Sequence, residues 1–466
     1  MHTHDPLSPL PRPFTVIILG SNLSSLSLAL SLTRKNIAFT LLARSPGPLP
    51  IADDDTPVVL HPHAVAILTQ LGVWGALQAR HTPLSGGWWS AVENSLGCPF
   101  TLLPRRHLLE TLFALLPAPS IHADTKAVDI RADAQGVTVI TAGMEMFCGD
   151  IVVDTEGLAA AFPVQRGEFT WITGDTPVDD ADPMEAEGKP GMTVKSWQGG
   201  VEVAIRMEGR SYWWSLLRGA SGQDVSSHLR LDADSTLSTL WLTRASSPKI
   251  SEVEIGISPP GHWYSARTLQ LADGLYKLAP AALLTASLEL EGVAALTNAI
   301  VAAGEDYTLA FSTFEKAMRP RAEMCAWVST LATRVAVRRA WWHGVLARRL
   351  PVWVYCELAI RSILLDSSEF PVRGKFIRAR RVGGVAGRVG DIGLRTKRVL
   401  QMEEVMAAVR CAVTDIESKP LARWGVRLIG GVAMVMLGMR WVKRVDFGWL
   451  LGRAVAMSVV AGRRRY

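Results

Sequence analysis

The chain has 466 residues, 48% of them hydrophobic, and this length fits two or three packed subdomains better than one simple core. Its five cysteines are odd in number, scattered and never spaced as CxxC, which argues against a disulfide framework and a zinc site. The cysteine usage indicates a reducing, cytoplasmic setting, and residues 1–13 are interpreted as a disordered lead-in, not a targeting peptide.

The net charge of +6 is the balance of an acidic body and a basic end. Residues 319–466 contain 28 Lys and Arg against 10 Asp and Glu, with tryptophans interleaved among the arginines. Aromatic and cationic side chains together suit a lipid headgroup layer, so peripheral contact with an internal membrane is one interpretation of this region. The other interpretation is a helical surface that contacts only solvent. We do not expect nucleic acid as a partner, because no recognition module accompanies the charge.

The first predicted elements form one βαβ unit. Residues 15–19 are expected to be a buried parallel strand, 24–33 a helix and 39–43 a second strand. Helices are then expected over 65–77 and within "PRRHLLETLFALLP". The alternation in "AVDIRADAQGVTVITAGMEMFCGDIVVD" predicts an antiparallel meander that returns to the first sheet.

The second half of the chain adds a second sheet and more helix. Residues 173–191 are acidic and broken by prolines, which predicts an exposed loop, and "VEVAIRMEGRSYWWSLLRG" predicts a hairpin turning at 208–210. Residues 281–303 predict a strong helix. The apolar runs 428–439 and 447–460 are each shorter than the roughly 20 residues of a membrane span. An interfacial or re-entrant hairpin and ordinary packing both remain open for them.

In this order the blocks resemble the aromatic-hydroxylase class of FAD-dependent monooxygenases, typified by para-hydroxybenzoate and salicylate hydroxylases. The resemblance covers about residues 14–320 and rests on five blocks, "VIILGSNLSSLSLALSLTRKNIAFTLLARSP", "HPHAVAILTQLG", "PRRHLLETL", "GDIVVDTEGLAAAF" and "LADGLYKLAPAALLTASLELEGVAAL". It implies an α/β fold with three parts. These are a Rossmann-like FAD-binding-type domain (14–165 and 262–318), an inserted antiparallel-sheet substrate domain (166–261) and a helical, basic C-terminal region (319–466).

Several residues that would contact the nucleotide, according to the resemblance, are replaced in this chain. In the G-x-G-x-x-G turn the first glycine makes the bend and the second lets the backbone approach the pyrophosphate. Only Gly20 remains here, with Asn22 and Ser25 at the other two positions. Ala43 stands where the family has an acidic residue for the adenosine ribose. The usual Gly-Ala-Asp-Gly is Asp154–Gly157 in this chain.

Residues that lie near the flavin ring in the family are replaced as well. Leu283, Leu284 and Thr285 replace the family's Gly-Gln-Gly, and Tyr276 stands at the usual histidine. The family's arginine is kept as Arg105 and its aspartate as Asp273. With Gly20, these two are the candidate cofactor-binding residues, and the resemblance implies FAD as the cofactor if one is used.

These replacements predict that the protein no longer binds FAD, so we expect no cofactor. The protein would then perform a non-redox cyclisation or isomerisation, such as a Diels-Alder reaction, on a hydrophobic terpenoid or polyketide of secondary metabolism. The candidate catalytic residues are Arg105, Tyr276 and Lys277 as hydrogen-bond donors, with Asp273 or Glu156 as a base or orienting group. The resemblance places several aromatic residues in blocks that face the substrate. We expect at least half of them to be core residues and the rest to line an apolar substrate pocket; they are Trp88, Trp89, Trp171, Trp197, Tyr212, Trp213 and Trp214.

Two other functions remain open. One is a working FAD-dependent monooxygenase that hydroxylates or epoxidises such a substrate, and the other is a non-catalytic scaffold protein. No metal site is predicted, because His61 and His63 are interpreted as a turn before a helix.

Overall fold

The computed structural model describes residues 13–44, 57–84, 87–158, 163–177, 191–197, 199–207, 210–219, 249–257, 261–337, 358, 362–365, 369–372 and 375–378. The chain divides into two compact units, Met1–Gly384 and Val385–Tyr466, and every described residue belongs to the first. Residues 1–12 of the predicted lead-in and the apolar runs 428–439 and 447–460 lie outside the described residues.

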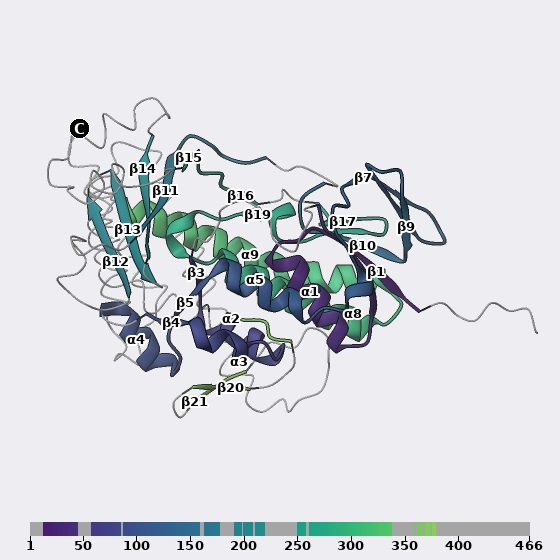
Figure 1. The fold of residues 1–466 in the computed structure, drawn as a ribbon, viewed down its shortest axis with the longest axis horizontal. Coiled ribbons are helices and arrows are strands. Elements are labelled where there is room, and N and C mark those ends of the chain that lie inside the picture. Colours follow the sequence, from purple (N-terminus) through teal and green to yellow (C-terminus); the bar gives the residue numbers. More distant parts are fainter. Residues whose placement is uncertain are drawn as a thin grey trace, which may run out of the picture. The chain divides into compact units, whose positions relative to one another are not determined.

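A mainly parallel sheet of six strands carries the first predicted βαβ unit (Figure 1). Strand β1 (Thr15–Leu19) pairs in parallel with β2 (Ala38–Leu42) and β10 (Ile151–Asp154). Helix α1 (Leu23–Arg34) connects β1 to β2, so the prediction is confirmed to within about a residue at each end. The remaining strands of this sheet are β6 (Ile121–His122), β17 (Tyr264–Ser265) and β18 (Thr268–Gln270).

Helix α8 (Thr285–Ala303) is the central helix of the core, as its apolar sequence predicts. It packs against α1, α2 (Pro62–Gln70) and α9 (Tyr307–Ala336). Among the described residues α8 alone is long and apolar enough to cross a membrane, but 78% of its most apolar window is buried inside the protein. A helix that is apolar all round is expected in a protein core as well as in a membrane.

The second sheet is antiparallel and has five strands in the order β12-β13-β14-β11-β15. They are β11 (Phe169–Pro177), β12 (Gly191–Trp197), β13 (Gly200–Met207), β14 (Arg210–Arg218) and β15 (Lys249–Glu252). The predicted hairpin is confirmed as β13 and β14. Part of the predicted loop 173–191 is strand instead, because residues 173–177 extend β11 and pair with residues 210–214 of β14. Cross-strand pairing supplies their backbone hydrogen bonds despite a polar composition.

Smaller elements complete the described unit. The predicted meander is the three-stranded sheet β7 (Ala127–Ala132), β8 (Val137–Thr141) and β9 (Met146–Gly149). The predicted helix 65–77 is divided into α2 and α3 (Trp74–Leu77), because Gly72 at a φ of +72° ends the first part. The others are β3 (Pro57–Leu60), β4 (Thr82–Pro83), β5 (Thr101–Pro104), β16 (Gly256–Ile257), β19 (Tyr276–Lys277), β20 (Glu369–Val372), β21 (Lys375–Arg378), α4 (Gly87–Leu96), α5 (Arg105–Ala114) and the 3₁₀ turns η1 (Gln78–Arg80), η2 (Ala118–Ser120), η4 (Ala272–Gly274) and η5 (Pro280–Ala282).

Helix α9 runs through the predicted domain boundary between residues 318 and 319, although Pro320 lies inside it. One face of the helix is buried on both sides of the proline, at Phe311, Phe314, Ala322 and Cys325. This burial offsets the lost backbone hydrogen bond. The start of the basic region therefore belongs to the first unit.

Candidate functional site

The turn after β1 keeps the shape of a dinucleotide-binding turn. Gly20 has a φ of +121°, and a Cβ atom at this position would lie 2.4 Å from Oγ1 of Thr155. A side chain is excluded here both by the backbone conformation and by this close contact. The first glycine of the motif is thus required by the fold alone.

The start of helix α1 is capped by a side chain of the chain itself. Asn22 is the N-cap residue, and its Oδ1 accepts a hydrogen bond of 3.0 Å from the backbone N–H of Ser25. Its Nδ2 donates to the carbonyl oxygen of Thr155 at 3.1 Å. In a dinucleotide site the N–H groups at this helix start receive the pyrophosphate. Asn22 therefore satisfies part of the site that a pyrophosphate would use.

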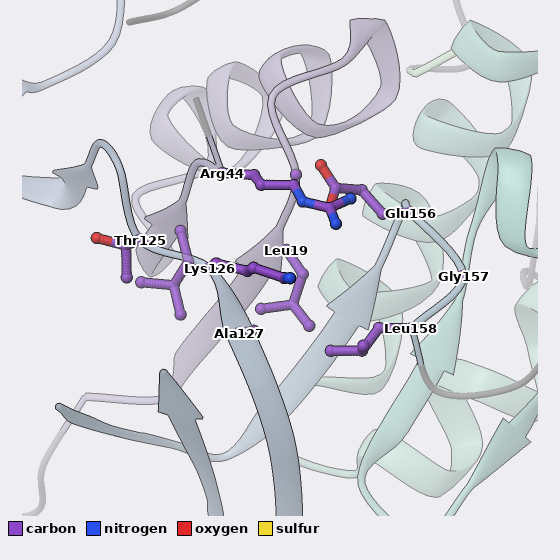
Figure 2. Close-up of a pocket in the computed structure, with 10 residues that line it drawn as sticks. Leu19, Arg44, Thr125, Lys126, Ala127, Glu156, Gly157 and Leu158 are labelled. Atoms are coloured by element: carbon purple, nitrogen blue, oxygen red, sulfur yellow. The ribbon is translucent and has the colours of Figure 1, made fainter. Parts of the chain in front are cut away.

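A cavity of about 100 Å³ lies beside this turn and includes Leu19 of β1 and Leu42 of β2 in its lining (Figure 2). Its charged residues are Arg44, Lys126 and Glu156. Figure 2 shows the guanidinium of Arg44 pointing toward the carboxylate of Glu156. Burial raises the pKa of Glu156, and the charge of Arg44 opposes this rise.

The described residues do not fit FAD bound through this turn. Asn22 already caps the helix, and Glu156 places a carboxylate within 3.3 Å of the Cβ position of Gly20. A pyrophosphate brought to the turn would meet this negative charge at short range. Ala43, which follows β2, has no side-chain acceptor for a ribose hydroxyl, and its carbonyl oxygen accepts a hydrogen bond from the N–H of Thr125.

A second group of charged side chains gathers around α8. Ser24 of α1 donates a hydrogen bond of 3.0 Å to Oε2 of Glu289, whose residue is only 6% exposed. Burial and then the charge of Asp273 raise the pKa of Glu289 to about 7, while Arg105, Ser24 and Lys277 lower it. This carboxyl group therefore gains and loses its proton near neutral pH.

Three of the four predicted catalytic residues belong to this group. Oδ1 of Asp273 and Nζ of Lys277 form an ion pair of 3.1 Å, with 49% and 32% of their side chains exposed. Arg105, the first residue of α5, is half-buried, and its charge acts on Glu289. Among the described residues its guanidinium has no hydrogen-bond or ion-pair partner.

The fourth, Tyr276, lies in the core instead. The residue is 3% exposed, and its hydroxyl is 4.0 Å from the Cβ position that Gly292 of α8 would have. Burial, followed by the charge of Glu289, raises the pKa of Tyr276 well above its usual value. Its hydroxyl lies beneath α8, which is a poor position from which to donate to a substrate.

Glu291, two residues after Glu289, has a different environment. Nε and Nη2 of Arg321 donate to its two oxygens at 2.7 and 2.6 Å, and Nε2 of His63 lies 2.8 Å away. Burial alone would raise the pKa of Glu291, but Arg321 and then His63 lower it to about 2. His61 is the N-cap of α2 and so precedes the helix as expected, whereas His63 lies in its first turn and not in a turn before it. No group of three metal-binding side chains occurs among the described residues.

The aromatic residues of the second sheet divide between its two faces. Trp171 of β11 and Trp214 of β14 stack with ring centroids 4.7 Å apart, and both pack with the main core. Trp213 points to the other face, where its ring would lie 2.5 Å from a Cβ atom at Gly174. The side chains of Trp88, Trp89 and Trp197 lie outside the described residues. The predicted apolar substrate pocket stays a prediction.

Sequence reasoning missed Arg44, Glu289 and Glu291. The two glutamates had a visible signal, because they interrupt a helix that is otherwise built of small and apolar residues. A carboxylate in a buried helix needs a partner or marks a functional group. Arg44 could have been noted as the cation directly after the altered ribose position.

Sequence comparison relates the chain to known enzymes. No protein-family model matches it. It is 26% identical over 348 residues to the FAD-dependent monooxygenase cle3 of Aspergillus versicolor, and the match covers 62% of this chain and 68% of that protein. Three other proteins named FAD-dependent monooxygenases, 28–31% identical, are matched over only 34–40% of their own length.

Structural comparison supports the predicted fold. Klebsiella pneumoniae HpxO complexed with FAD and uric acid matches with a TM-score of 0.63 and 14% identity, covering 74% of this chain and 97% of HpxO. A substrate complex of salicylate hydroxylase matches with a TM-score of 0.57 and 14% identity, covering 74% and 98%. The predicted α/β class, with a parallel sheet, an antiparallel sheet and helices, is confirmed.

Proposed function

The chain is a relative of the FAD-dependent monooxygenases of the aromatic-hydroxylase class, and we propose that it is an enzyme that uses this fold without a flavin. Its reaction would be a cyclisation or isomerisation of a hydrophobic terpenoid or polyketide of secondary metabolism. The observation that carries the proposal is the side-chain cap at the phosphate turn, where Asn22 binds the start of α1.

The groups around α8 suit such a reaction. The guanidinium of Arg105 polarises a substrate carbonyl, and Lys277, held by Asp273, adds a second donor at the exposed side. The stacked pair Trp171 and Trp214 belongs to an apolar sheet face that would hold a flexible substrate in one reactive conformation. These donors act without any change in the oxidation state of the substrate.

A second candidate is an FAD-dependent monooxygenase that hydroxylates or epoxidises a substrate of the same class. The relatives support it more directly than they support a cyclase, because cle3 has this name and HpxO was solved with FAD. Gly20, Arg105 and Asp273 also remain at the family's positions. The cofactor content of the protein separates the two candidates.

The proposal includes a cellular setting. The enzyme would work in the cytoplasm, and residues 319–466 would be the part that touches an internal membrane, through their arginines and tryptophans. Binding of the purified full chain to anionic vesicles in a sedimentation assay tests this. Equal sedimentation with and without vesicles contradicts it.

The first experiment is the visible absorption spectrum of the purified protein, before and after incubation with excess FAD and desalting. We expect no flavin band in either spectrum, and products with the mass of the substrate. About one flavin per chain, NADPH oxidation and a product heavier by one oxygen would support the monooxygenase instead. The matched variant Asn22→Gly/Ser25→Gly restores both glycines, so it should retain more flavin than the wild type.

A further inference from the structure

Glu289 has the geometry of a proton-transferring group. Its Oε2 is held by Ser24, a fully buried residue in the first turn of α1. Its other oxygen, Oε1, has no hydrogen-bond partner among the described residues. One oxygen is therefore fixed in position, and the other is available to an incoming group.

Charged side chains lie around Glu289, but none of the described ones forms an ion pair with its carboxyl group. Arg105 acts on it electrostatically but forms no ion pair with it, which leaves the guanidinium free to bind another oxygen. The other titratable groups that act on the carboxyl are Asp273 and Lys277. Glu289 in turn acts on the buried hydroxyl of Tyr276, whose pKa it helps to raise. Asp273 and Lys277 pair with each other and are partly exposed, so they mark the side open to solvent.

We infer that Glu289 transfers protons to and from carbon in this site, and that Arg105 binds the carbonyl oxygen of the substrate. The substrate class is a hydrophobic ketone, aldehyde or ester with a hydrogen on the carbon next to the carbonyl. This inference rests on the proposed function, since it specifies how an isomerisation proceeds without a redox cofactor.

The step balances within the substrate and the enzyme. The C–H bond next to the carbonyl breaks, and its proton forms an O–H bond with Oε1 of Glu289. The electron pair forms a C=C bond, and the negative charge moves to the oxygen beside Arg105. Where a C=C bond stands one carbon beyond the broken C–H bond, the enolate is a dienolate, and Glu289 returns the proton to its far carbon. This moves the double bond into conjugation with the carbonyl and gives an isomer of the same mass. A carboxyl with a pKa of about 7 is suited to both halves of this cycle.

A purely structural carboxylate would have a different environment. Glu291 shows that environment in the same helix, because both of its oxygens accept hydrogen bonds from Arg321. Glu289, in contrast, is 6% exposed and accepts a described hydrogen bond at Oε2 alone, so it lacks the two-point contact that holds Glu291. This environment suits a group that must exchange a proton.

The first test observes the proton directly. Infrared difference spectra between wild type and Glu289→Gln isolate the C=O stretch of the protonated carboxyl across a pH titration. We expect a midpoint near pH 7, shifted upward in Arg105→Gln and downward in Asp273→Asn, because Arg105 lowers the pKa and Asp273 raises it. A carboxyl that stays in one protonation state from pH 5.5 to 8.5 (about ±1.5 pH units around the pKa), or a midpoint unmoved in Arg105→Gln, overturns the inference.

The second test uses farnesylacetone, a terpenoid ketone, as the probe. The full-length protein in D₂O should speed deuterium exchange next to the carbonyl, measured by mass spectrometry. Glu289→Gln should lose roughly 100-fold or more of this rate, while probe binding, followed by tryptophan fluorescence, stays unchanged. No exchange above the buffer rate, or wild-type exchange in Glu289→Gln, overturns the inference. Neither result measures flavin content. The proposed flavin-free function is tested separately, by the flavin content of the protein.

Discussion

Glu289 and Glu291 lie two residues apart on α8, and their environments are opposite. Glu291 is enclosed by Arg321 and His63, and its pKa is about 2. Glu289 shares one hydrogen bond with the part of the chain that the structure describes, and its pKa is about 7. Both are buried, so burial does not distinguish them. The difference comes from the partners on the facing helices, and it separates a carboxylate that joins helices from one that titrates.

The largest change in stability is expected from breaking the ion pair between Arg321 and Glu291. Arg321→Leu leaves the charge of Glu291 buried with His63 alone, and removing one partner of a buried ion pair typically costs about 3–5 kcal/mol. Urea unfolding should show this loss in the free energy of unfolding. Arg321→Lys, which keeps the charge but not the two-point contact, should lose less. Equal stability of all three proteins would show that the pair contributes nothing.

A smaller effect on stability is expected from Glu289, and this effect depends on pH. The pKa of Glu289 is about 7 in the folded protein against 4.5 in the unfolded chain, so the folded state binds the proton more tightly. The wild type should therefore lose stability as pH rises from 4.5 to 7, by at most about 3 kcal/mol. Glu289→Gln removes this dependence, so it should be more stable than wild type at pH 8. Parallel pH profiles of the two proteins would contradict the assignment.

The smallest effect sharpens the comparison by adding an exposed pair. Arg106 and Glu110 form an ion pair of 2.9 Å on α5, with 62% and 44% of their side chains in solvent. Exposed helix pairs of this spacing contribute only about 0.3–0.5 kcal/mol. Arg106→Gln should therefore change the free energy of unfolding by no more than this amount in low salt. A loss as large as that of Arg321→Leu would mean that burial does not set the value of these pairs.

Much of the frame could be predicted from local sequence. The strand 15–19, the helix after it and the helix expected over 281–303 follow from apolar runs and their periods. The structure confirms all three, although the last helix begins only at Thr285, after the 3₁₀ turn Pro280–Ala282. The hairpin at 208–210 followed from alternation and its turn residues. These signals are contained within a few adjacent residues.

The site could be predicted only in part, because its geometry is set by tertiary contacts. Arg105 and Asp273 were identified through the resemblance and Lys277 as a candidate donor, and electrostatic contacts around Glu289 bring them into one group. Ser24 and Glu289 are 265 residues apart in sequence, so no local pattern relates them. Tyr276 was expected to face a substrate, but the short strand β19 turns its side chain beneath α8.

The stacked indoles of Trp171 and Trp214 give the second sheet an optical property of its own. Their rings are 4.7 Å apart and only 17° from parallel, one on each of two neighbouring strands. Transition dipoles held this close couple, and the coupling appears as a paired positive and negative band in circular dichroism. A molecule that spreads the two strands or slides between the rings would change the amplitude of that pair of bands. The protein thus contains an unlabelled reporter of events at the sheet, readable before any product is known.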